Sequence, residues 1–317
     1  MTIGVIGAGA FGTALGVTLA RAGHDVALWG RGLSESARES TRLPGVAFPA
    51  IMRAASLEDA AGAPILLMAL PAQVLGGFAA EHRDLLAGRQ LVACSKGIEL
   101  SSGRGPSGVL REAVGQALNG GSVSVLTGPS FAADIAGGLP TALTLASDAR
   151  DGAALQKALS TPTLRLYLTD DLAGAELGGA LKNVIAIACG AAIGAGLGDS
   201  ARAAVMTRGF AEMRRLAPRF NARPETLAGL SGLGDLALTC TSDQSRNYRL
   251  GLHLGRGEGP EPGVTVEGAA TAQAVATLAE REGLDLPVTR AVALLTRGEI
   301  SPESALSGLM SRPLKEE

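Results

Sequence analysis

The sequence predicts a two-domain α/β protein, in which a doubly wound, mostly parallel sheet is followed by a domain built only of helices. Three observations carry this prediction. Short apolar strands alternate with helical segments up to about residue 172, and a glycine-rich turn joins the first strand to the first helix. Helical patterns then continue from Gly174 without a convincing strand. We therefore expect domains at residues 1–172 and 173–317, a division that the chain length also favours.

The composition narrows the class of function. A net charge of −2 gives no support for binding to nucleic acid or to an anionic membrane surface. Cys94, Cys189 and Cys240 are far apart and lack metal-ligand spacing, so we expect neither a disulfide framework nor a metal site. The sequence leads directly into an apolar strand, which predicts a cytoplasmic protein. The apolar run 184–198 looks too short and too glycine-rich to span a membrane.

The first strand and the turn after it indicate nucleotide binding. Thr2–Gly7 is apolar, and a helix rich in alanine and leucine follows to about Ala22. Between them, Gly7, Gly9 and Gly12 form the pattern GxGxxG in the context that gives it meaning. The first glycine allows a tight turn, the second lets a pyrophosphate approach the backbone, and the third lets the helix pack on the strand. The alternative is a glycine-rich turn without a ligand.

The end of the second strand bears on the choice of nicotinamide cofactor. An NAD-specific domain places a carboxylate there, on the ribose. In this chain Asp25–Trp29 is followed by Gly30 and Arg31. A cation suits the 2′-phosphate of NADP, so we expect NADP(H) to be preferred and NAD(H) to be possible. Alternatively, Arg31 stacks on adenine or points to solvent, and both cofactors are accepted.

Further strands are expected at 64–70, 90–94, 122–126, 141–146 and 164–168, with helices between most of them. In such sheets ligands bind beyond the carboxyl ends of the strands. Lys96 and the segment Gly128–Ala132 follow two of these strands, so contact with an anionic ligand is expected. The alternatives are a solvated loop cation for Lys96 and a helix cap for Ser130.

The helices of the second domain are expected at roughly 174–196, 199–216, 244–255, 267–282, 287–297 and 302–311. The first is apolar on nearly every side, which is typical of a buried helix. Glycines 190, 194, 196 and 198 are expected to let other backbones approach it. We expect the nucleotide site to precede this helix in the sequence and the substrate pocket to be formed by residues that follow it.

Lys182 lies at the polar end of this buried helix. Only four of the 28 basic residues are lysines, so lysine is not the default surface cation of this chain. Lys157 falls in a predicted surface helix and Lys315 near the C-terminus. Because a buried ammonium is costly unless it is paired or used, Lys182 calls for a chemical role.

A nicotinamide enzyme that interconverts an alcohol and a ketone needs a group that transfers a proton at the carbinol oxygen. His24 precedes the second strand at the wrong end of the sheet, His82 lies late on a helix, and His253 lies at least one turn after the polar start of its helix. Lys182 is therefore the candidate, since desolvation favours the neutral amine. The alternative is a structural Lys–Asp pair.

Other polar candidates lie in the second domain. Asp235, among small residues, either caps a helix or pairs with a buried cation. Arg246 and Asn247 follow Ser245 at a predicted helix start and form a plausible seat for a phosphate. The alternative for Arg246 is a surface arginine. Glu267 opens a helix, where an acidic residue is favoured in any case.

Together these segments resemble the bacterial-type NAD(P)-dependent glycerol-3-phosphate dehydrogenases. The matching blocks are GAGAFGTAL, WGR, SKGIE, GPSFA, ELGGALKNVIAIACG, GLGDLALTCTS, SRNYRLG and VEG, in this order over almost the whole chain. The resemblance implies a Rossmann-type domain and then an all-α domain for substrate binding and dimerisation, as in 6-phosphogluconate-dehydrogenase-like proteins. This chain departs from the family at Ala10, where a hydroxyl residue is common, and in the loop Glu39–Pro44, which lacks the usual Asn and Tyr.

The resemblance implies that a homodimer interconverts sn-glycerol 3-phosphate and dihydroxyacetone phosphate with NAD(P)(H), supplying phospholipid synthesis. Lys182 is implied as proton donor and acceptor, with Asp235 orienting it. The implied cofactor contacts are Gly7, Gly9, Ala10, Phe11, Gly12, Arg31, Lys96, Ala132, Arg246 and Glu267. The implied substrate contacts are Lys96, Gly128, Ser130, Lys182, Asp235, Ser245, Arg246 and Asn247.

Two other interpretations stay open at this point. A related lysine-dependent reductase of β-hydroxy acids or ketopantoate would bind a carboxylate and need no phosphate seat. A non-catalytic NADP-sensing protein would bind the cofactor without any substrate-dependent oxidation of it.

Overall fold

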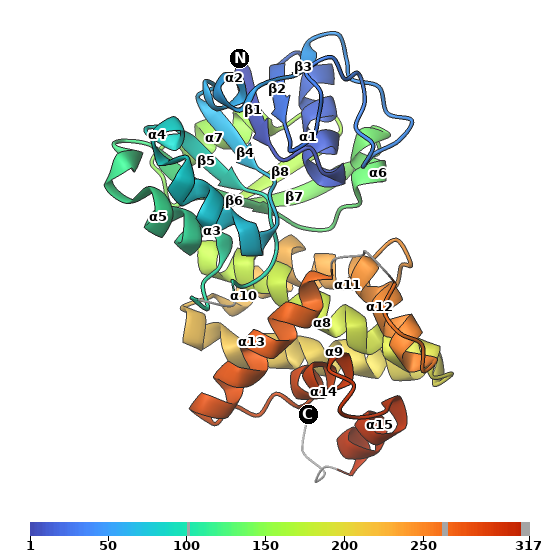
Figure 1. Cartoon of the computed structure of the whole chain (residues 1–317). Helices are drawn as coiled ribbons and strands as arrows, with labels where there is room; N and C mark the ends of the chain where they lie inside the picture. The colour runs from blue at the N-terminus through green and yellow to red at the C-terminus, as the bar shows by residue number, and fades with distance from the viewer. Residues whose placement is uncertain (100–101, 262–265, 312–317) are drawn as a thin grey trace. The chain divides into compact units, whose positions relative to one another are not determined.

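The structure is a computed structural model that describes residues 1–99, 102–261 and 266–311 (Figure 1). Lys315 lies outside these residues. The chain divides into two compact units, Met1–Glu176 and Leu177–Glu317. Each unit has its own hydrophobic core.

The first unit contains one eight-stranded sheet in the order β3-β2-β1-β4-β5-β6-β7-β8. The strands are β1 (Thr2–Ile6), β2 (Asp25–Trp29), β3 (Met52–Ala54), β4 (Ile65–Met68), β5 (Gln90–Ala93), β6 (Ser122–Thr127), β7 (Thr141–Ala146) and β8 (Leu164–Thr169). The fold class expected from the sequence is confirmed. β3 was not expected, because three residues are too few to show a period.

Helices cover both faces of this sheet (Figure 1). One face packs against α1 (Ala10–Arg21), α6 (Ala132–Ala136) and α7 (Gly152–Leu159), and its core includes Leu15, Leu145 and Leu159. The opposite face packs against α2 (Leu57–Ala61), α3 (Ala72–Glu81), α4 (Arg83–Leu86) and α5 (Pro106–Val114). Burial on both faces explains why β4 is apolar at every position.

The direction of the strands changes once. β1, β2, β3, β4, β5 and β6 run parallel, β7 pairs antiparallel with β6, and β8 is parallel to β7. The carboxyl ends of β1, β4, β5 and β6 therefore share one edge, and the end of β7 lies at the opposite edge. Alternation of strands and helices alone does not reveal such a reversal.

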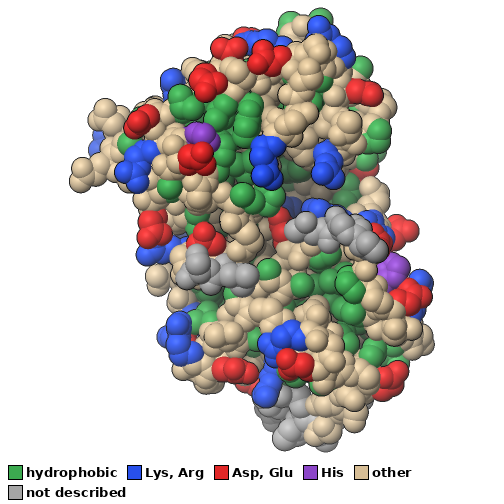
Figure 2. Space-filling model, viewed as in Figure 1, with side chains coloured by type: hydrophobic (Ala, Val, Ile, Leu, Met, Phe, Trp, Pro, Cys, Tyr) green, Lys and Arg blue, Asp and Glu red, His purple; other side chains and the backbone are tan. Residues whose placement is uncertain are grey.

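In the described residues of the second unit, all regular secondary structure is helical. The α-helices are α9 (Gly198–Leu216), α10 (Pro224–Ala228), α11 (Asp235–Cys240), α12 (Arg246–Gly255), α13 (Glu267–Glu282), α14 (Pro287–Thr296) and α15 (Pro302–Met310), together with most of α8 (Leu172–Gly194). α10 and α11 were not expected from the sequence, because six residues or fewer do not complete two helical turns. Acidic and basic side chains are interspersed on the face seen in Figure 2.

The long helix α8 is a core helix. Its 23 residues have a mean hydropathy of 1.5 in the most apolar window, and 83% of that window is buried. By length and composition alone Leu172–Gly194 could cross a membrane, but this helix begins well before the apolar run 184–198 that was expected to be too short. Its burial is typical of the central helix of a globular protein.

Two of the four glycines of this region allow close approach, as expected. A Cβ atom at Gly190 would lie 2.1 Å from the carbonyl oxygen of Tyr248, and one at Gly194 would lie 2.3 Å from that of Leu252. Gly196 and Gly198 have open space around them and positive φ angles of 74° and 82°. Gly196 lies in the turn between α8 and α9 and Gly198 begins α9, so the close-approach prediction was wrong for them.

Candidate active site

Lys182 is buried on α8 with its side chain only 9% exposed. Its ammonium Nζ donates to Oδ1 of Asp235 at 2.8 Å and to the hydroxyl of Thr239 at 2.7 Å. Asp235 is fully buried, so its charge is compensated by the ammonium and not by water. Of the two possibilities for Asp235, the structure shows the partner of a buried cation.

A short π-helix leads directly into α11 and places Asp235 beside Lys182. Leu230–Gly234 forms a π-helix, and Asp235 is the first residue of α11. The π-helix packs tightly on α8, because a Cβ at Gly178 would lie 2.5 Å from the carbonyl oxygen of Ser231. Gly178 lies one turn before Lys182, so this contact sets the distance between the carboxylate and the lysine.

Thr239 was missed by the sequence analysis. Its hydroxyl accepts from Lys182 and donates to Oδ1 of Asp235 at 3.2 Å. The signal was present in the sequence, since residues four apart on a helix share a face and Thr239 follows Asp235 by four. The three groups form one buried network within the second unit.

A second polar network surrounds Asn183, the residue after the lysine. Its Oδ1 accepts from Nδ2 of Asn247 at 3.0 Å, and Oδ1 of Asn247 accepts from the backbone N–H of Gly268 at 2.9 Å. Asn247 is thereby fixed on the first turn of α12, and the start of α13 is tied to it. Ser245 caps α12, because its hydroxyl accepts from the N–H of Tyr248 at 3.2 Å.

Arg246 and Glu267 occupy the helix starts expected for them. Arg246 is the first residue of α12 and is exposed, and Glu267 is the first residue of α13. Residues Ser245, Arg246 and Asn247 therefore gather at one helix N-terminus, where backbone N–H groups and a guanidinium together suit an anion. That arrangement is the one expected of a phosphate seat.

In the first unit, the glycine turn after β1 fits a dinucleotide. Gly7 has a φ of +124°, which disfavours any side chain, and a Cβ at Gly12 would lie 2.2 Å from the carbonyl oxygen of Gly7. At Gly9, by contrast, a Cβ would meet nothing within 4 Å. This open space lies at the start of α1, where Gly9 is the cap residue and Ala10 and Phe11 begin the helix. A pyrophosphate can approach the backbone there.

Arg31 lies just beyond the carboxyl end of β2, two residues after Trp29, and is exposed. No carboxylate stands at the end of this strand, so the expected position of a 2′-phosphate carries a cation. The structure thus keeps Arg31 available to a ligand.

The remaining predicted residues of the first unit lie at the same edge of the sheet. Lys96 follows β5, and its ammonium donates to the carbonyl oxygen of Gly128 at 3.1 Å. Ser130 donates to the same carbonyl at 3.2 Å. The helix after it begins at Ala132 with Phe131 as the cap residue, so the interpretation of Ser130 as a helix cap was wrong.

Two of the three histidines are engaged elsewhere, and the cysteines are buried. The rings of His82 and Phe78 pack with their centroids 4.5 Å apart, and Nδ1 of His253 lies 2.6 Å from Oε2 of Glu258. All three cysteines are free and buried. Burial raises the pKa of Cys94 to about 12, and the pKa of Cys240 is raised by a hydrogen bond with Cys189 and by burial. Protonated thiols are poor nucleophiles and poor metal ligands.

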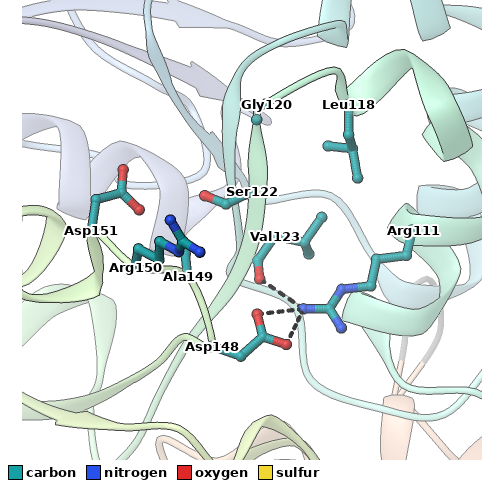
Figure 3. Close-up of a pocket in the computed structure, with 10 residues that line it drawn as sticks. Arg111, Leu118, Gly120, Ser122, Val123, Asp148, Ala149, Arg150 and Asp151 are labelled. Carbon is teal, nitrogen blue, oxygen red and sulfur yellow. Dashed lines mark hydrogen bonds and ion pairs between the residues drawn. The ribbon is translucent and has the colours of Figure 1, made fainter.

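A sizeable pocket lies away from these groups, at the opposite edge of the sheet (Figure 3). It has a volume of about 620 Å³ and is lined by the start of β6 and the segment after β7. Arg111 of α5 contacts both carboxylate oxygens of Asp148 there at 2.8 Å. It holds none of the residues predicted to act, and no cluster of three or more potential metal ligands occurs among the described residues.

Comparison with known proteins decides between the interpretations left open by the sequence. Models of the N-terminus and the C-terminus of NAD-dependent glycerol-3-phosphate dehydrogenase match residues 2–153 and 171–307. The chain belongs to the glycerol-3-phosphate dehydrogenase family. As a member of this family it is an enzyme, an oxidoreductase that uses a nicotinamide cofactor.

Glycerol-3-phosphate dehydrogenases of several bacteria match over almost their full length. The [NAD(P)+] enzyme of Paracoccus denitrificans is 60% identical, with 100% of each chain covered. The crystal structure of glycerol-3-phosphate dehydrogenase from Coxiella burnetii is 35% identical, with a TM-score of 0.91 over 98% of this chain and 99% of that one. A ketopantoate reductase from Ralstonia eutropha shares only the fold, with a TM-score of 0.60 and 17% identity over 96% of this chain and 100% of that one.

Proposed function

We propose that this chain interconverts sn-glycerol 3-phosphate and dihydroxyacetone phosphate, with Lys182 as the general acid and base. The buried contact of Lys182 with Asp235 and Thr239 is the observation that carries the proposal. A buried ammonium fixed by two hydrogen bonds stands ready to exchange a proton without reorganising its surroundings. Family membership and the phosphate-binding arrangement at Ser245, Arg246 and Asn247 support the choice of substrate.

When bound, the reduced nicotinamide supplies a hydride for C2 of the ketone. In that direction Lys182 donates a proton from its ammonium to the ketone oxygen, which becomes the C2 hydroxyl. In the reverse direction the neutral amine accepts the hydroxyl proton. Asp235 and Thr239 hold the amine in place, and the Asp235 carboxylate stabilises the ammonium when it reforms.

The other predicted contacts divide between the two units, as the resemblance implies. We propose that Gly7, Gly9, Ala10, Phe11, Gly12, Arg31 and Ala132 bind the cofactor, with Lys96, Arg246 and Glu267. Gly128, Ser130, Ser245 and Asn247 would bind the substrate with Lys96, Lys182, Asp235 and Arg246. Residues 1–172 would then form the dinucleotide-binding domain and 173–317 the substrate-binding and dimerisation domain.

The substitution Lys182→Arg tests the proton-transfer role. Arginine keeps the positive charge but does not release its proton at neutral pH. We expect turnover to fall by about 10²- to 10⁴-fold, the usual contribution of a general acid or base. Steady-state rates with dihydroxyacetone phosphate measure this, and the dissociation constant of NADPH should stay unchanged. Turnover close to that of the wild type would eliminate Lys182 from this role.

A substrate comparison separates the proposed reaction from that of the structurally similar reductases. We expect oxidation of NADPH with dihydroxyacetone phosphate and none with ketopantoate, because the N-terminus of α12 suits a phosphate. The opposite preference would replace the proposed substrate. NADPH binding without any substrate-dependent oxidation would instead identify a cofactor sensor.

We further propose that NADP(H) is preferred over NAD(H), that no metal takes part, and that the enzyme is a cytoplasmic homodimer supplying phospholipid synthesis. The exposed Arg31 supports the cofactor preference, and the three free, buried cysteines suit a reducing compartment. Light scattering coupled to size-exclusion chromatography tests the dimer. Activity after treatment with a chelator tests the absence of a metal requirement.

A further inference from the structure

Two buried hydroxyl groups stand at the edge of the sheet where the cofactor is expected. Ser95 and Thr127 are 9% and 1% exposed, and neither hydroxyl oxygen has a hydrogen-bond partner among the described residues. The contrast with Ser124, three residues earlier on β6, is sharp. Its buried hydroxyl donates to the hydroxyl of Ser147 at 2.8 Å.

Ser95 and Thr127 lie at the carboxyl ends of neighbouring strands. β5 and β6 pair in parallel with Ala93 opposite Val125; Thr127 lies two positions further along β6, and Ser95 lies two residues beyond the end of β5. Neighbouring strands are about 4.8 Å apart, so both hydroxyls can reach one small ligand group. The hydrogen bond from Lys96 to the carbonyl of Gly128 ties together the residues that directly follow them.

An unpartnered buried hydroxyl destabilises a folded chain, because it loses its hydrogen bonds to water. Five other buried polar atoms among the described residues also lack a partner, but of these seven only Ser95 and Thr127 stand at the carboxyl ends of neighbouring strands beside Lys96. Hydroxyls both donate and accept hydrogen bonds, and a primary carboxamide offers one acceptor oxygen and two donor N–H groups. A phosphate offers only acceptor oxygens, so it would pair with the O–H groups of the two hydroxyls and leave their acceptor oxygens without a partner.

The order of the strands indicates which end of the dinucleotide reaches this place. The pyrophosphate fits the turn after β1, and Arg31 beyond β2 lies on the side of the adenosine ribose. The nicotinamide end must extend the other way, across β4 toward β5 and β6. These two strands lie about 10 and 14 Å from β1 at the usual strand spacing.

We propose that the hydroxyls of Ser95 and Thr127 bind the carboxamide of the nicotinamide and thereby fix the orientation of its ring. Ser95 and Thr127 act as positioning residues, because the ring face that points to the substrate determines where the hydride goes. The proposal rests on the nicotinamide cofactor of the family and not on the role of Lys182.

The experiment measures binding to the full chain without substrate. Thr127→Val and Ser95→Ala remove one hydroxyl each with little change in shape, and Ser124→Ala is the matched control. Isothermal titration calorimetry gives the dissociation constants of NADPH and of 2′-phospho-ADP-ribose, which lacks the nicotinamide ring. Thermal melts of the ligand-free variants give their stability.

We expect NADPH to bind about threefold to tenfold more weakly to each of the two variants, the value of about one hydrogen bond. Binding of 2′-phospho-ADP-ribose should be unchanged, and the melting temperature of the ligand-free variants should be equal or higher. Ser124→Ala should show the reverse, with a lower melting temperature and unchanged NADPH binding.

Three results would overturn the proposal. One is equal weakening of both ligands, which would mean a general distortion of the site. Another is unchanged NADPH binding in both variants. The third is a lowered melting temperature in the ligand-free variants, since it would show that the hydroxyls already have structural partners. None of these results depends on proton transfer, so failure here is distinguishable from failure of the Lys182 proposal.

Discussion

Arg31 shows how one side chain at a strand end can set a preference between two cofactors. The guanidinium is exposed directly after β2 and lies where a 2′-phosphate is expected, with no carboxylate at the strand end. An arginine binds a phosphate through charge-assisted hydrogen bonds that NADH cannot make. We therefore propose that a preference for NADPH depends on this residue.

We predict that Arg31→Ala weakens NADPH binding by about tenfold, because it removes a charged hydrogen bond. Binding of NADH should change by less than about twofold, since the 2′-hydroxyl makes no such contact. Kd values for both reduced cofactors check this, and Arg38→Ala on the following exposed loop serves as the control. Equal losses for the two cofactors would place Arg31 on the adenine and not on the 2′-phosphate.

The contact between α8 and α12 shows what glycine does at the scale of an element. Gly190 and Gly194 on α8 face Gly251 and Gly255 on α12, and each position has a facing backbone atom within 2.3 Å of where a Cβ would lie. Such contact requires two glycines, four residues apart, on both helices. It brings α12, with Ser245 and Asn247 at its start, directly onto the helix that carries Lys182.

We predict that Gly190→Ala destabilises the protein by about 3 kcal/mol, because the added methyl group would force two backbones apart. The matched control is Gly308→Ala on α15, where a Cβ would meet nothing within 4 Å. That change should be neutral or stabilise by about 0.5–1 kcal/mol, the helix preference for alanine. Chemical denaturation measures both. Equal stability of the two variants would contradict the close packing.

At the scale of the whole molecule, two carboxylates, one half-buried and one buried, hold distant segments together in the same way. Glu176 at the start of α8 accepts from the N–H of Ser107 at 2.5 Å and from its hydroxyl at 2.9 Å, at the N-terminus of α5. Glu212 of α9 accepts from the N–H groups of Val288 and Thr289 at the N-terminus of α14. Each unit thus contains a helix that begins with proline and is capped by a carboxylate from far along the chain.

Glu176 gives this arrangement a dependence on pH. Burial raises the pKa of its carboxyl from 4.5 to about 7, against the opposing effects of Ser107 and Arg111. The folded chain therefore binds this proton more tightly than the unfolded chain does. The stability that it contributes is complete below about pH 4.5 and is lost as the pH rises through 7.

We predict that Glu176→Gln removes this dependence. The free energy of unfolding of the wild type, relative to the variant, should fall by on the order of 2 kcal/mol between pH 5 and pH 8. Urea denaturation at several pH values measures the difference. If the two stabilities run parallel over this range, the carboxyl of Glu176 does not titrate there.

Much of the fold and part of the site were predictable from the residues, because their signals are local. Apolar runs of four to six residues revealed all strands except the three-residue β3. GxGxxG marked the turn after β1, and the bounds of β2, β7 and α13 agree with the structure at both ends. The scarcity of lysine drew attention to Lys96 and Lys182, and the apolar helix around Lys182 together with the poorly placed histidines favoured Lys182 before any contact was known.

What the sequence by itself determined is the alternation of elements, the glycine turn and the identity of the buried amine. Only the tertiary structure decided that Asp235 and Thr239 hold this amine, from 53 and 57 residues away, and that β7 turns against β6. It alone showed the two hydroxyls of Ser95 and Thr127 left without partners. The physical reason is range: propensity and periodicity act over a few residues, whereas pairing between distant groups depends on how whole helices and strands pack.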